Sequence, residues 1–533
     1  MTECSQSEFE FKGHFSRRVG AAFDGGTMTS DGGALLLRET DRRLNLLPRL
    51  AECFLDRRNP VLVTHPVAEM VAQRVYALAL GYEDLNDHEQ LRQDPLLHVL
   101  AGKAKMDEPL AGKSTLNRLE LGDGSPHRYK KITYWKDSLD TLLVAVFLES
   151  FETPPEEIVL DLDTTDVELN GKQEGRFFHG YYDEYCYLPL YIFAGEHLLC
   201  VRLREADRDA ADGCLAEVQR IVEQIRARWS RVHIILRADS GFCRDELMDW
   251  AEQQEGVDYV FGVPRNNRLR RLIAPQLAEA AAEHARTGKP ARVFPEFLHE
   301  TTTGSWTRAR RVVAKAEHLD GKENPRYVVT SLPPEQWPAR QLYEDLYCAR
   351  GDMENRIKEQ FHLFAGRAST ETMRANQFRM YLSGMAYVLV SGLRRLGLKA
   401  TELATAQAAT IREKLFKIGT RVRVSVRRVW LSMASSYPHQ RLFSAGPGEP
   451  ALLKRARQSG DHGADSRRGH PPRRSVPPRC LSAPLSRRQT HKIPLYRPQL
   501  TMIFLRSQNG AIPRCGLPAN GHLQPACEKF RLA

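Results

Sequence analysis

The first candidates for chemistry are carboxylates at the ends of two apolar strands. In IVLDLDTTD, Asp161 and Asp163 alternate with apolar residues and therefore share one face of a predicted strand. In VHIILRADSG, Asp239 follows an apolar run, at the carboxyl end where open α/β sheets bind ligands. Each aspartate taken singly is also typical of a turn or a helix cap.

A third acidic position lies in the stretch YCARGDMENRIKE, which has the pattern of one unbroken helix. Tyr347, Arg350, Glu354 and Lys358 would lie within about 80° of one another around its axis. This polar stripe has two interpretations. It is either a solvated face with ion pairs between residues four apart, or one side of a site completed by Asp163 and Asp239.

Three carboxylates brought together would repel one another, and some would take up protons unless a cation neutralised them. A hard divalent ion with oxygen ligands resolves this, with Mg²⁺ as the first choice and Mn²⁺ as substitute. Two such ions can activate a water or a 3′-hydroxyl and stabilise the leaving oxygen of a phosphoryl transfer. In that case Arg350 and Lys358 would hold phosphates while Glu354 holds metal.

The elements that position these residues are those of an α/β protein. Residues 1–150 are predicted to be mostly helical, including a helix that begins at Pro66 and ends at Gly81. From residue 155 onward strands and amphipathic helices alternate, which predicts an α/β core with a mixed sheet. Residues 269–338 read as a helix followed by strand-like segments.

Charge is distributed unevenly along the 533 residues. The net charge is +11, but residues 445–533 alone carry 16 Lys/Arg against 4 Asp/Glu, which leaves the preceding body nearly neutral. The same segment holds 12 of the 30 prolines. Two interpretations stay open: a disordered basic tail that holds DNA phosphates, or out-of-frame or read-through sequence.

Other features exclude several classes of protein. The ten cysteines form no CxxC pair, which favours free thiols in a reducing compartment. The beginning is acidic and polar, and the longest apolar run has only 13 residues, so we expect a cytoplasmic protein with no membrane association. The AGKST segment lacks the first glycine of a phosphate-binding P-loop, since Asp107 stands in its place.

Four motifs in order give the chain a resemblance to a known family. They are LDLDTTD, ILRADSGFCRDELMDW, YVFGVPRNNRL and YCARGDMENRIKEQF. With them the chain resembles the DDE transposases of the insertion-sequence 1380 group, within the wider insertion-sequence 4 clan that carries a Tyr-Arg-Glu-Lys signature. The resemblance runs from about residue 10 to Phe443.

The resemblance implies an RNase H-like catalytic core with three acidic metal ligands. An Asp-x-Thr pattern selects Asp163, and Asp239 and Glu354 match the second and third positions. Tyr347 and Arg350 match the signature. The signature Lys does not: Phe361 stands at its position, and the nearest lysine is Lys358.

The resemblance also implies a role for the long separation between Asp239 and Glu354. It corresponds to a strand-rich insertion, about 269–338, in which a Trp can stack on a base pulled out of the duplex. Trp306 is the candidate, with a Trp that packs its own sheet as the alternative. Arg265 and its neighbours in GVPRNNRLRR are candidates for contacts with the DNA backbone, or for a solvated face.

These features predict three regions: a helical end-recognition region, 1–150, an RNase H-like catalytic domain, 151–444, and the tail, 445–533. We expect a transposase that binds terminal inverted repeats as at least a dimer, cleaves the ends with two Mg²⁺ ions, and joins them to target DNA. The alternative is a cleavage-inactive copy that only binds DNA and inhibits. A third alternative is a hydrolase that acts on sugars with a pair of carboxylates and needs no metal.

Overall fold

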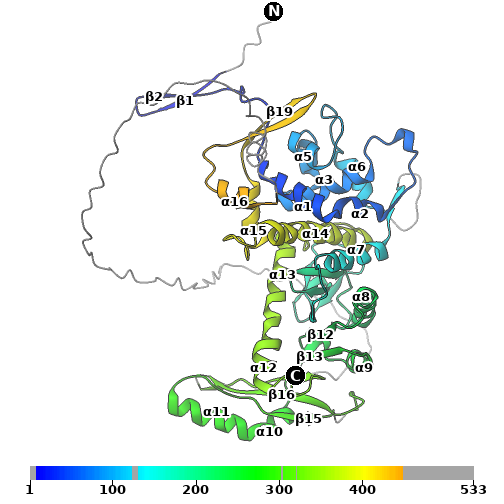
Figure 1. The fold of residues 1–533 in the computed structure, drawn as a ribbon, viewed down its shortest axis with the longest axis vertical. Coiled ribbons are helices and arrows are strands. Elements are labelled where there is room, and N and C mark those ends of the chain that lie inside the picture. The colour runs from blue at the N-terminus through cyan, green and yellow to red at the C-terminus, as the bar shows by residue number, and fades with distance from the viewer. Residues whose placement is uncertain (1–7, 123–129, 302–303, 320, 448–533) are drawn as a thin grey trace, which may run out of the picture. The chain divides into compact units, whose positions relative to one another are not determined.

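The computed structural model describes residues 8–122, 130–301, 304–319 and 321–447 (Figure 1). The predicted tail therefore lies, from residue 448 on, outside the described residues. None of the helices in the described ranges combines the length and the apolar character that crossing a membrane requires.

The N-terminal part of the described chain is mostly helical. An exposed hairpin comes first, then helices joined by short turns. The elements are β1 (Phe9–His14), β2 (Arg17–Ala21), β3 (Met28–Thr29), η1 (Gly32–Ala34), α1 (Leu35–Leu44), α2 (Leu46–Glu52), β4 (Phe54–Asp56), η2 (Pro60–Leu62), α3 (Val67–Leu80), η3 (Leu85–Asp87), α4 (His88–Leu91), α5 (Pro95–Leu100), α6 (Lys113–Glu120), β5 (Ile132–Tyr134) and α7 (Lys136–Glu149).

Helix α3 confirms the boundaries predicted from its capping residues. Pro66 precedes the first helical residue, where its missing N–H costs nothing. Gly81 ends the helix with φ 98°, in the left-handed region that a residue with a Cβ avoids. Every residue of α3 except Ala68 is buried.

A mixed sheet forms the centre of the chain. Its order is β11-β10-β6-β12-β13-β18-β16-β14, with β15 and β17 paired to β16. Strands β12 and β13 run parallel to β6, whereas β10, β11, β16 and β18 form antiparallel pairs. The strands are β6 (Glu157–Thr164), β10 (Leu190–Ala194), β11 (His197–Arg202), β12 (His233–Ala238), β13 (Val257–Val263), β14 (Ala291–Val293), β15 (Glu296–His299), β16 (Arg310–Leu319), β17 (Lys322–Glu323) and β18 (Arg326–Thr330). A smaller sheet is built from β7 (Val167–Glu168), β8 (Phe177–His179) and β9 (Glu184–Tyr187).

The mixed α/β core predicted from the sequence is confirmed, and the predicted insertion extends it. Its strands β16 and β18 continue the central sheet beyond β13 instead of forming a sheet of their own. The helices of this part of the chain are α8 (Cys214–Arg228), η4 (Ser240–Phe242), α9 (Asp245–Gln253), α10 (Asn267–Leu272) and α11 (Ala274–Thr287).

The stretch predicted as one unbroken helix is interrupted, and that prediction was wrong. After α12 (Ala339–Gln341) the chain forms a π-helical segment, η5 (Leu342–Tyr347), then a 3₁₀ turn, η6 (Cys348–Arg350), and becomes regular only in α13 (Gly351–His362). The Leu346 carbonyl accepts a hydrogen bond of 2.7 Å from the Arg237 guanidinium. A side chain that takes up a backbone carbonyl in this way disturbs the regular helical pattern.

Helix α14 (Met373–Leu393) joins the N-terminal helices to the sheet. It is buried along nearly its whole length and packs against α1, α3 and β11. Its apolar residues belong to one core with those of α1, α3 and α7. The remaining elements are η7 (Arg394–Leu398), α15 (Ala408–Ile411), η8 (Arg412–Phe416), β19 (Thr420–Ser425), β20 (Arg428–Met433) and α16 (Gln440–Ala445).

Candidate active site

The two aspartates lie at the ends of neighbouring parallel strands. In the register of β6 and β12, Leu162 pairs with Ala238. Asp163 and Asp239 each follow one residue later, so the strand pairing itself brings them side by side. The pairing of β6 with β12 is therefore enough to bring the two carboxylates close together, without a contribution from a loop.

Asp163 is held by one cation and one backbone group. Its Oδ2 lies 3.0 Å from Nη1 of Arg350, and its Oδ1 accepts a hydrogen bond of 2.9 Å from the Thr164 N–H. The side chain is only 14% exposed. Burial raises the pKa of Asp163 to about 6; Arg350 opposes the shift, while Asp239 and Glu354 add to it by like-charge repulsion. The three predicted carboxylates are therefore close enough to influence one another.

Asp239 makes the turn that follows its strand. Its Oδ1 accepts a hydrogen bond of 2.8 Å from the Gly241 N–H and caps the 3₁₀ turn η4. The capping role that the sequence allowed is thus present. This hydrogen bond uses Oδ1 of Asp239, so the other oxygen, Oδ2, is available as a metal ligand.

Arg350 joins the helix to the strand. Its Nη1 contacts Asp163, and its Nη2 lies 3.6 Å from Oε1 of Glu354. Burial lowers the pKa of this guanidinium. The nearby carboxylates, Asp163 first, raise it, and the net shift of the pKa is upward. Glu354 is half exposed. In the described structure, the cation between the carboxylates is this arginine.

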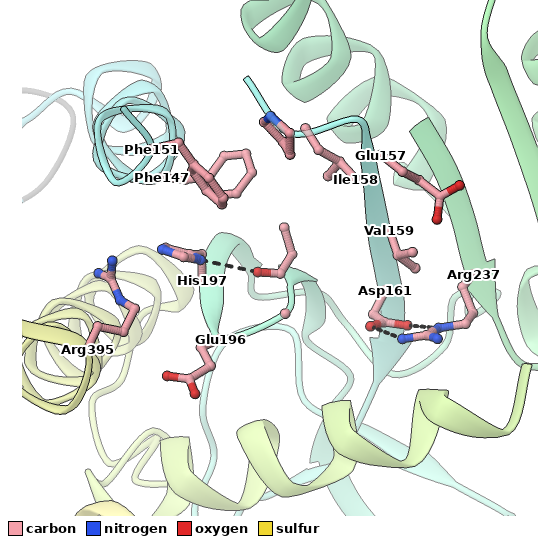
Figure 2. A pocket seen from close by; sticks show the side chains of 13 residues that line it. Phe147, Phe151, Glu157, Ile158, Val159, Asp161, Glu196, His197, Arg237 and Arg395 are labelled. Carbon is pink, nitrogen blue, oxygen red and sulfur yellow. Dashed lines mark hydrogen bonds and ion pairs between the residues drawn. The ribbon is translucent and has the colours of Figure 1, made fainter. Parts of the chain in front are cut away.

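Asp161 has a different environment from Asp163, although both lie on the same face of β6. Its two carboxylate oxygens form a paired contact with Arg237, at 2.6 and 2.8 Å, and both side chains are buried (Figure 2). Arg237 also donates to the Leu346 carbonyl. This ion pair thus fastens the central sheet to the segment just before Tyr347.

Tyr347 reaches the same place from the helical side. A Cβ built on Gly262 would lie 2.6 Å from the Tyr347 hydroxyl oxygen and 2.9 Å from the backbone nitrogen of Ser240. Only a residue without a Cβ allows this approach. Burial raises the pKa of the Tyr347 hydroxyl, so this group stays a neutral hydrogen-bonding group beside the turn at Asp239.

Two of the predicted DNA contacts lie on the surface. Lys358 is exposed on α13, and no ion pair joins it to Glu354 in the part of the chain that the structure describes. Phe361, at the signature position of the Lys, is partly exposed. Arg265 is exposed and donates to the Asn324 side chain at 3.1 Å. The roles assigned to Lys358 and Arg265 stay predictions.

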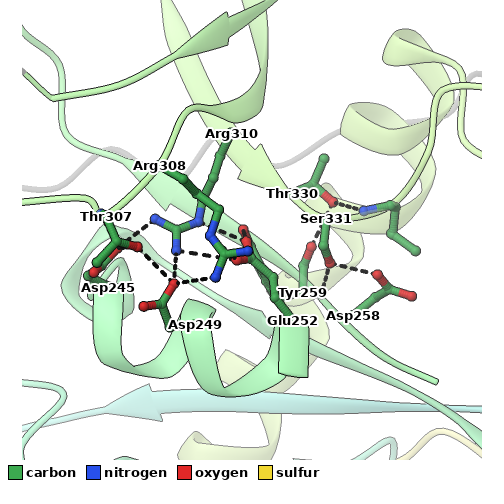
Figure 3. A network of polar contacts seen from close by, with 11 residues as sticks. Asp245, Asp249, Glu252, Asp258, Tyr259, Thr307, Arg308, Arg310, Thr330 and Ser331 are labelled. Atoms are coloured by element: carbon green, nitrogen blue, oxygen red, sulfur yellow. Dashed lines mark hydrogen bonds and ion pairs between the residues drawn. The ribbon is translucent and has the colours of Figure 1, made fainter. Parts of the chain in front are cut away.

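Trp306 is buried against the sheet. It is 8% exposed and has the His299 ring and the Arg310 guanidinium at 5.7 and 5.8 Å from its own ring. Arg310 is in turn fixed by three acids of α9, namely Asp245, Asp249 and Glu252, at 2.6 to 2.8 Å (Figure 3). Stacking of this indole on a base would require its surroundings to open, and its predicted role stays a prediction.

The donor set is of the kind that a hard divalent ion takes. All three candidate ligands are carboxylates. Burial, with a smaller contribution from like-charge repulsion, raises the pKa of Asp163, and a bound cation would favour the charged form of this group. No group of three or more His, Cys, Asp or Glu side chains lies in ready-made metal-binding geometry among the described residues. The ligands fit a divalent ion in chemistry, and Arg350 and Glu354 would have to adjust around it.

A cleft of about 450 Å³ lies beside the first part of β6. Residues from Glu157 to Asp161 contribute to its lining, whereas Asp163 does not. The aromatic rings of Phe147 and Phe151 face the first residues of β6 across it, and His197 and Arg395 complete one wall (Figure 2). Burial lowers the pKa of His197 to about 3, so the ring is neutral. Nothing in the sequence pattern signals this cleft, because its walls come from four distant segments.

Comparison with protein-family models assigns the chain to a class of proteins, the transposases. A family model described as Transposase DDE domain group 1 matches residues 11–452. The chain belongs to this family, the DDE transposases, whose members generally use divalent metal ions.

One solved structure that the chain matches is entitled "Cryo-EM structure of piggyBac transposase synaptic complex with hairpin DNA (SNHP)". The two share 10% sequence identity with a TM-score of 0.36, and the match covers 73% of this chain and 79% of the other. No curated protein matches this sequence.

Proposed function

We propose that this protein is a transposase of the insertion-sequence 1380 group that moves its own element by a cut-and-paste route. It binds the terminal inverted repeats, cleaves the DNA ends, and joins the freed 3′-hydroxyls to target DNA. The observation that carries this proposal is the meeting of Asp163 and Asp239, at the ends of two parallel strands, with Arg350 and Glu354 from the helical segment.

The fold of the catalytic part supports the proposal. We assign an RNase H-like core to strands β6, β10, β11, β12 and β13. The first three are antiparallel neighbours, and the last two follow parallel to the first on its other side, which is the strand arrangement expected of that core. Within the proposed catalytic domain, 151–444, the carboxylates then stand at the ends of the two central strands.

Asp163, Asp239 and Glu354 would hold the metal, which we propose to be two Mg²⁺ ions with Mn²⁺ as substitute. When bound, these ions lower the pKa of the attacking hydroxyl and stabilise the leaving oxygen of the phosphoryl transfer. The Arg350 guanidinium lies between the strand and the helix, in contact with Asp163 and Glu354. Once cations neutralise these acids, Arg350 would release Asp163 and contact a phosphate instead. Tyr347 positions the turn at Asp239 through its contact with Gly262.

The remaining parts receive supporting roles in this proposal. The helical region, 1–150, would recognise the inverted repeats, and the insertion, about 269–338, would contact the DNA backbone with Arg265. Joining two ends requires two catalytic sites, so we propose a homodimer in the complex with paired ends.

Asp239→Asn tests the catalytic assignment. The amide keeps an oxygen for the Gly241 N–H, so the turn survives, but the charge that holds a cation is lost. We expect cleavage of a duplex carrying the inverted repeat to fall below detection in Mg²⁺, while binding of the same duplex stays within a few fold of wild type.

Asp84→Asn is the matched control. Asp84 also caps a 3₁₀ turn, accepting a hydrogen bond of 2.8 Å from the Asn86 N–H, but lies outside the site. At saturating duplex, where a change in end recognition by the helical region does not affect the rate, its cleavage rate should equal that of wild type. Wild-type cleavage by Asp239→Asn would refute the assignment. Binding without cleavage by the wild-type protein, in Mg²⁺ or Mn²⁺, would instead identify a cleavage-inactive copy that acts as a DNA-binding inhibitor.

A further inference from the structure

One face of the hairpin formed by β19 and β20 carries arginines that pair with no acid among the residues that the structure describes. The hairpin turns through two residues, Val426 and Arg427, and its first strand also pairs with β3. In an antiparallel pair, residues opposite each other point to the same side. The pairs Arg421 with Ser432, Arg423 with Trp430, and Ser425 with Arg428 therefore form one face, which we call the arginine face.

The opposite face holds the hairpin on the body of the protein. Val422 is buried, and Leu431 opposite it packs against the main hydrophobic core. The arginine face must then point outward. Its three arginines are exposed, Trp430 is 51% exposed, and Ser432 is half-buried.

The charge of this face is not balanced by acids. The chain holds no Asp or Glu between Glu413 and Glu449. Among the described residues no ion pair involves Arg421, Arg423 or Arg428, although Arg428 lies over the Trp430 ring at 5.7 Å. Elsewhere on the described surface, Arg208 and Arg286 each pair with an acid nearby in sequence. In a body with almost no net charge, this face is a local excess of positive charge.

We propose that the arginine face binds duplex DNA, an inference that rests on the proposed transposase function. A two-stranded ribbon fits the major groove of B-DNA, which is about 12 Å wide. Arg421 and Arg423, two residues apart on one strand, are separated by about 6.7 Å and can reach successive groups of the DNA backbone. The Ser432 hydroxyl can donate to a phosphate, whereas the Ser425 hydroxyl donates to the Arg428 carbonyl at 3.0 Å and holds the end of the hairpin. The Trp430 ring offers a flat surface against sugar or base.

The test compares the salt dependence of DNA binding between variants of the full chain. Arg421→Gln, Arg423→Gln and Arg428→Gln are combined, and binding of a fluorescently labelled duplex is measured between about 50 and 200 mM salt. Each lost phosphate contact lowers the slope of log K against log salt by about 0.9. For three contacts, wild-type affinity should therefore fall about 40-fold more than that of the variant over this range.

Two further variants make the result specific. Replacing Arg208, Arg340 and Arg367 by Gln removes the same charge from exposed, ion-paired positions outside both proposed DNA-contacting regions, and should leave the slope unchanged. Replacing the three face arginines by Lys keeps the charge and should restore most of the slope, which also shows that the hairpin folds when its face is altered.

The outcomes separate this inference from the proposed function. If the Gln variant binds with the wild-type slope, or if the control variant loses as much, the inference is wrong even when the protein cleaves DNA. Loss of binding to an acidic polypeptide without loss of binding to the duplex would also overturn it. If wild-type protein binds no duplex at all, the proposed function and this inference both fall.

Discussion

At the scale of single residues, the structure separates two aspartates that the strand pattern leaves equivalent. Asp161 and Asp163 share a face of β6, but Asp161 is closed off by a paired contact with buried Arg237. Asp163 meets Arg350 from the helical segment, and its pKa is raised to about 6 by burial and like charges. Burial raises the pKa of both aspartates, so the shift alone does not separate them. The difference is that Asp161 has both oxygens on a buried arginine, whereas Asp163 lies beside two further carboxylates, as is common at functional sites.

This difference predicts opposite effects of two substitutions. Asp161→Ala would leave the Arg237 guanidinium buried without its counter-ion, which costs about 3–5 kcal/mol of unfolding free energy. Asp163→Ala removes a carboxylate that burial and two like charges disfavour, and Arg350 keeps Glu354 as a second partner at 3.6 Å. This substitution should change the unfolding free energy by less than about 1 kcal/mol while abolishing cleavage. Urea unfolding of both variants measures this. Equal destabilisation by the two would contradict the division of roles.

At the scale of elements, the site depends on how closely the helical segment approaches the sheet. The π-helical and 3₁₀ turns before α13 bring Tyr347 against Gly262 of β13, and the Leu346 carbonyl is tied to Arg237. The same segment carries Arg350 and leads into Glu354. Its position is set by contacts with two strands and not by its own helical pattern.

Gly262→Ala tests this approach. The added methyl would meet the Tyr347 hydroxyl and the Ser240 backbone, so the helical segment or the turn at Asp239 must shift. We expect cleavage to fall at least tenfold, with a loss of about 1–3 kcal/mol of stability, as for overpacking elsewhere. Gly180→Ala is the control, since a Cβ there meets nothing within 4 Å. Wild-type cleavage by Gly262→Ala would show that the close contact is dispensable.

At the scale of the whole molecule, the described N-terminal helices and the chain after the catalytic carboxylates share one core. Side chains of α1, α3 and α7 pack with those of α14 in a single cluster. Hydrogen bonds reinforce the contact: Tyr381 donates to Asp140 at 2.6 Å, and Arg379 to Glu120 at 2.9 Å. The predicted boundary near residue 150 therefore does not divide two separate cores. It divides the proposed end-recognition region from the proposed catalytic region, and this division of roles stays a prediction.

The shared core predicts that the catalytic region does not fold alone. A fragment of residues 151–447 would expose the α14 face that normally covers the N-terminal helices, and apolar surface of this size leads to aggregation. Residues 1–447 should remain monomeric in the absence of DNA and unfold cooperatively. Size-exclusion chromatography and thermal unfolding compare the two. A monomeric 151–447 fragment with the same unfolding temperature as 1–447 would refute the prediction.

Much of this arrangement can be predicted from local sequence, because the signals are local. Pro66 and Gly81 bound α3 through their own backbone restrictions, and the alternation around Asp163 assigns its face through the two-residue period of a strand. The alternating strands and helices predict the mixed sheet. The choice of Asp163 over Asp161 came from the family resemblance, and the structure adds a physical reason for it.

Tertiary structure alone decided the rest, because it depends on contacts between residues far apart in the chain. The break before α13 follows from a bond between Arg237 and Leu346, 109 positions apart, which a helical pattern cannot reveal. Trp306 is buried in an apolar cluster built from several strands and helices, with Arg310 held beside it by three acids of α9. The sequence by itself determined which residues could form the site; packing determined that Arg350 is the cation standing among them.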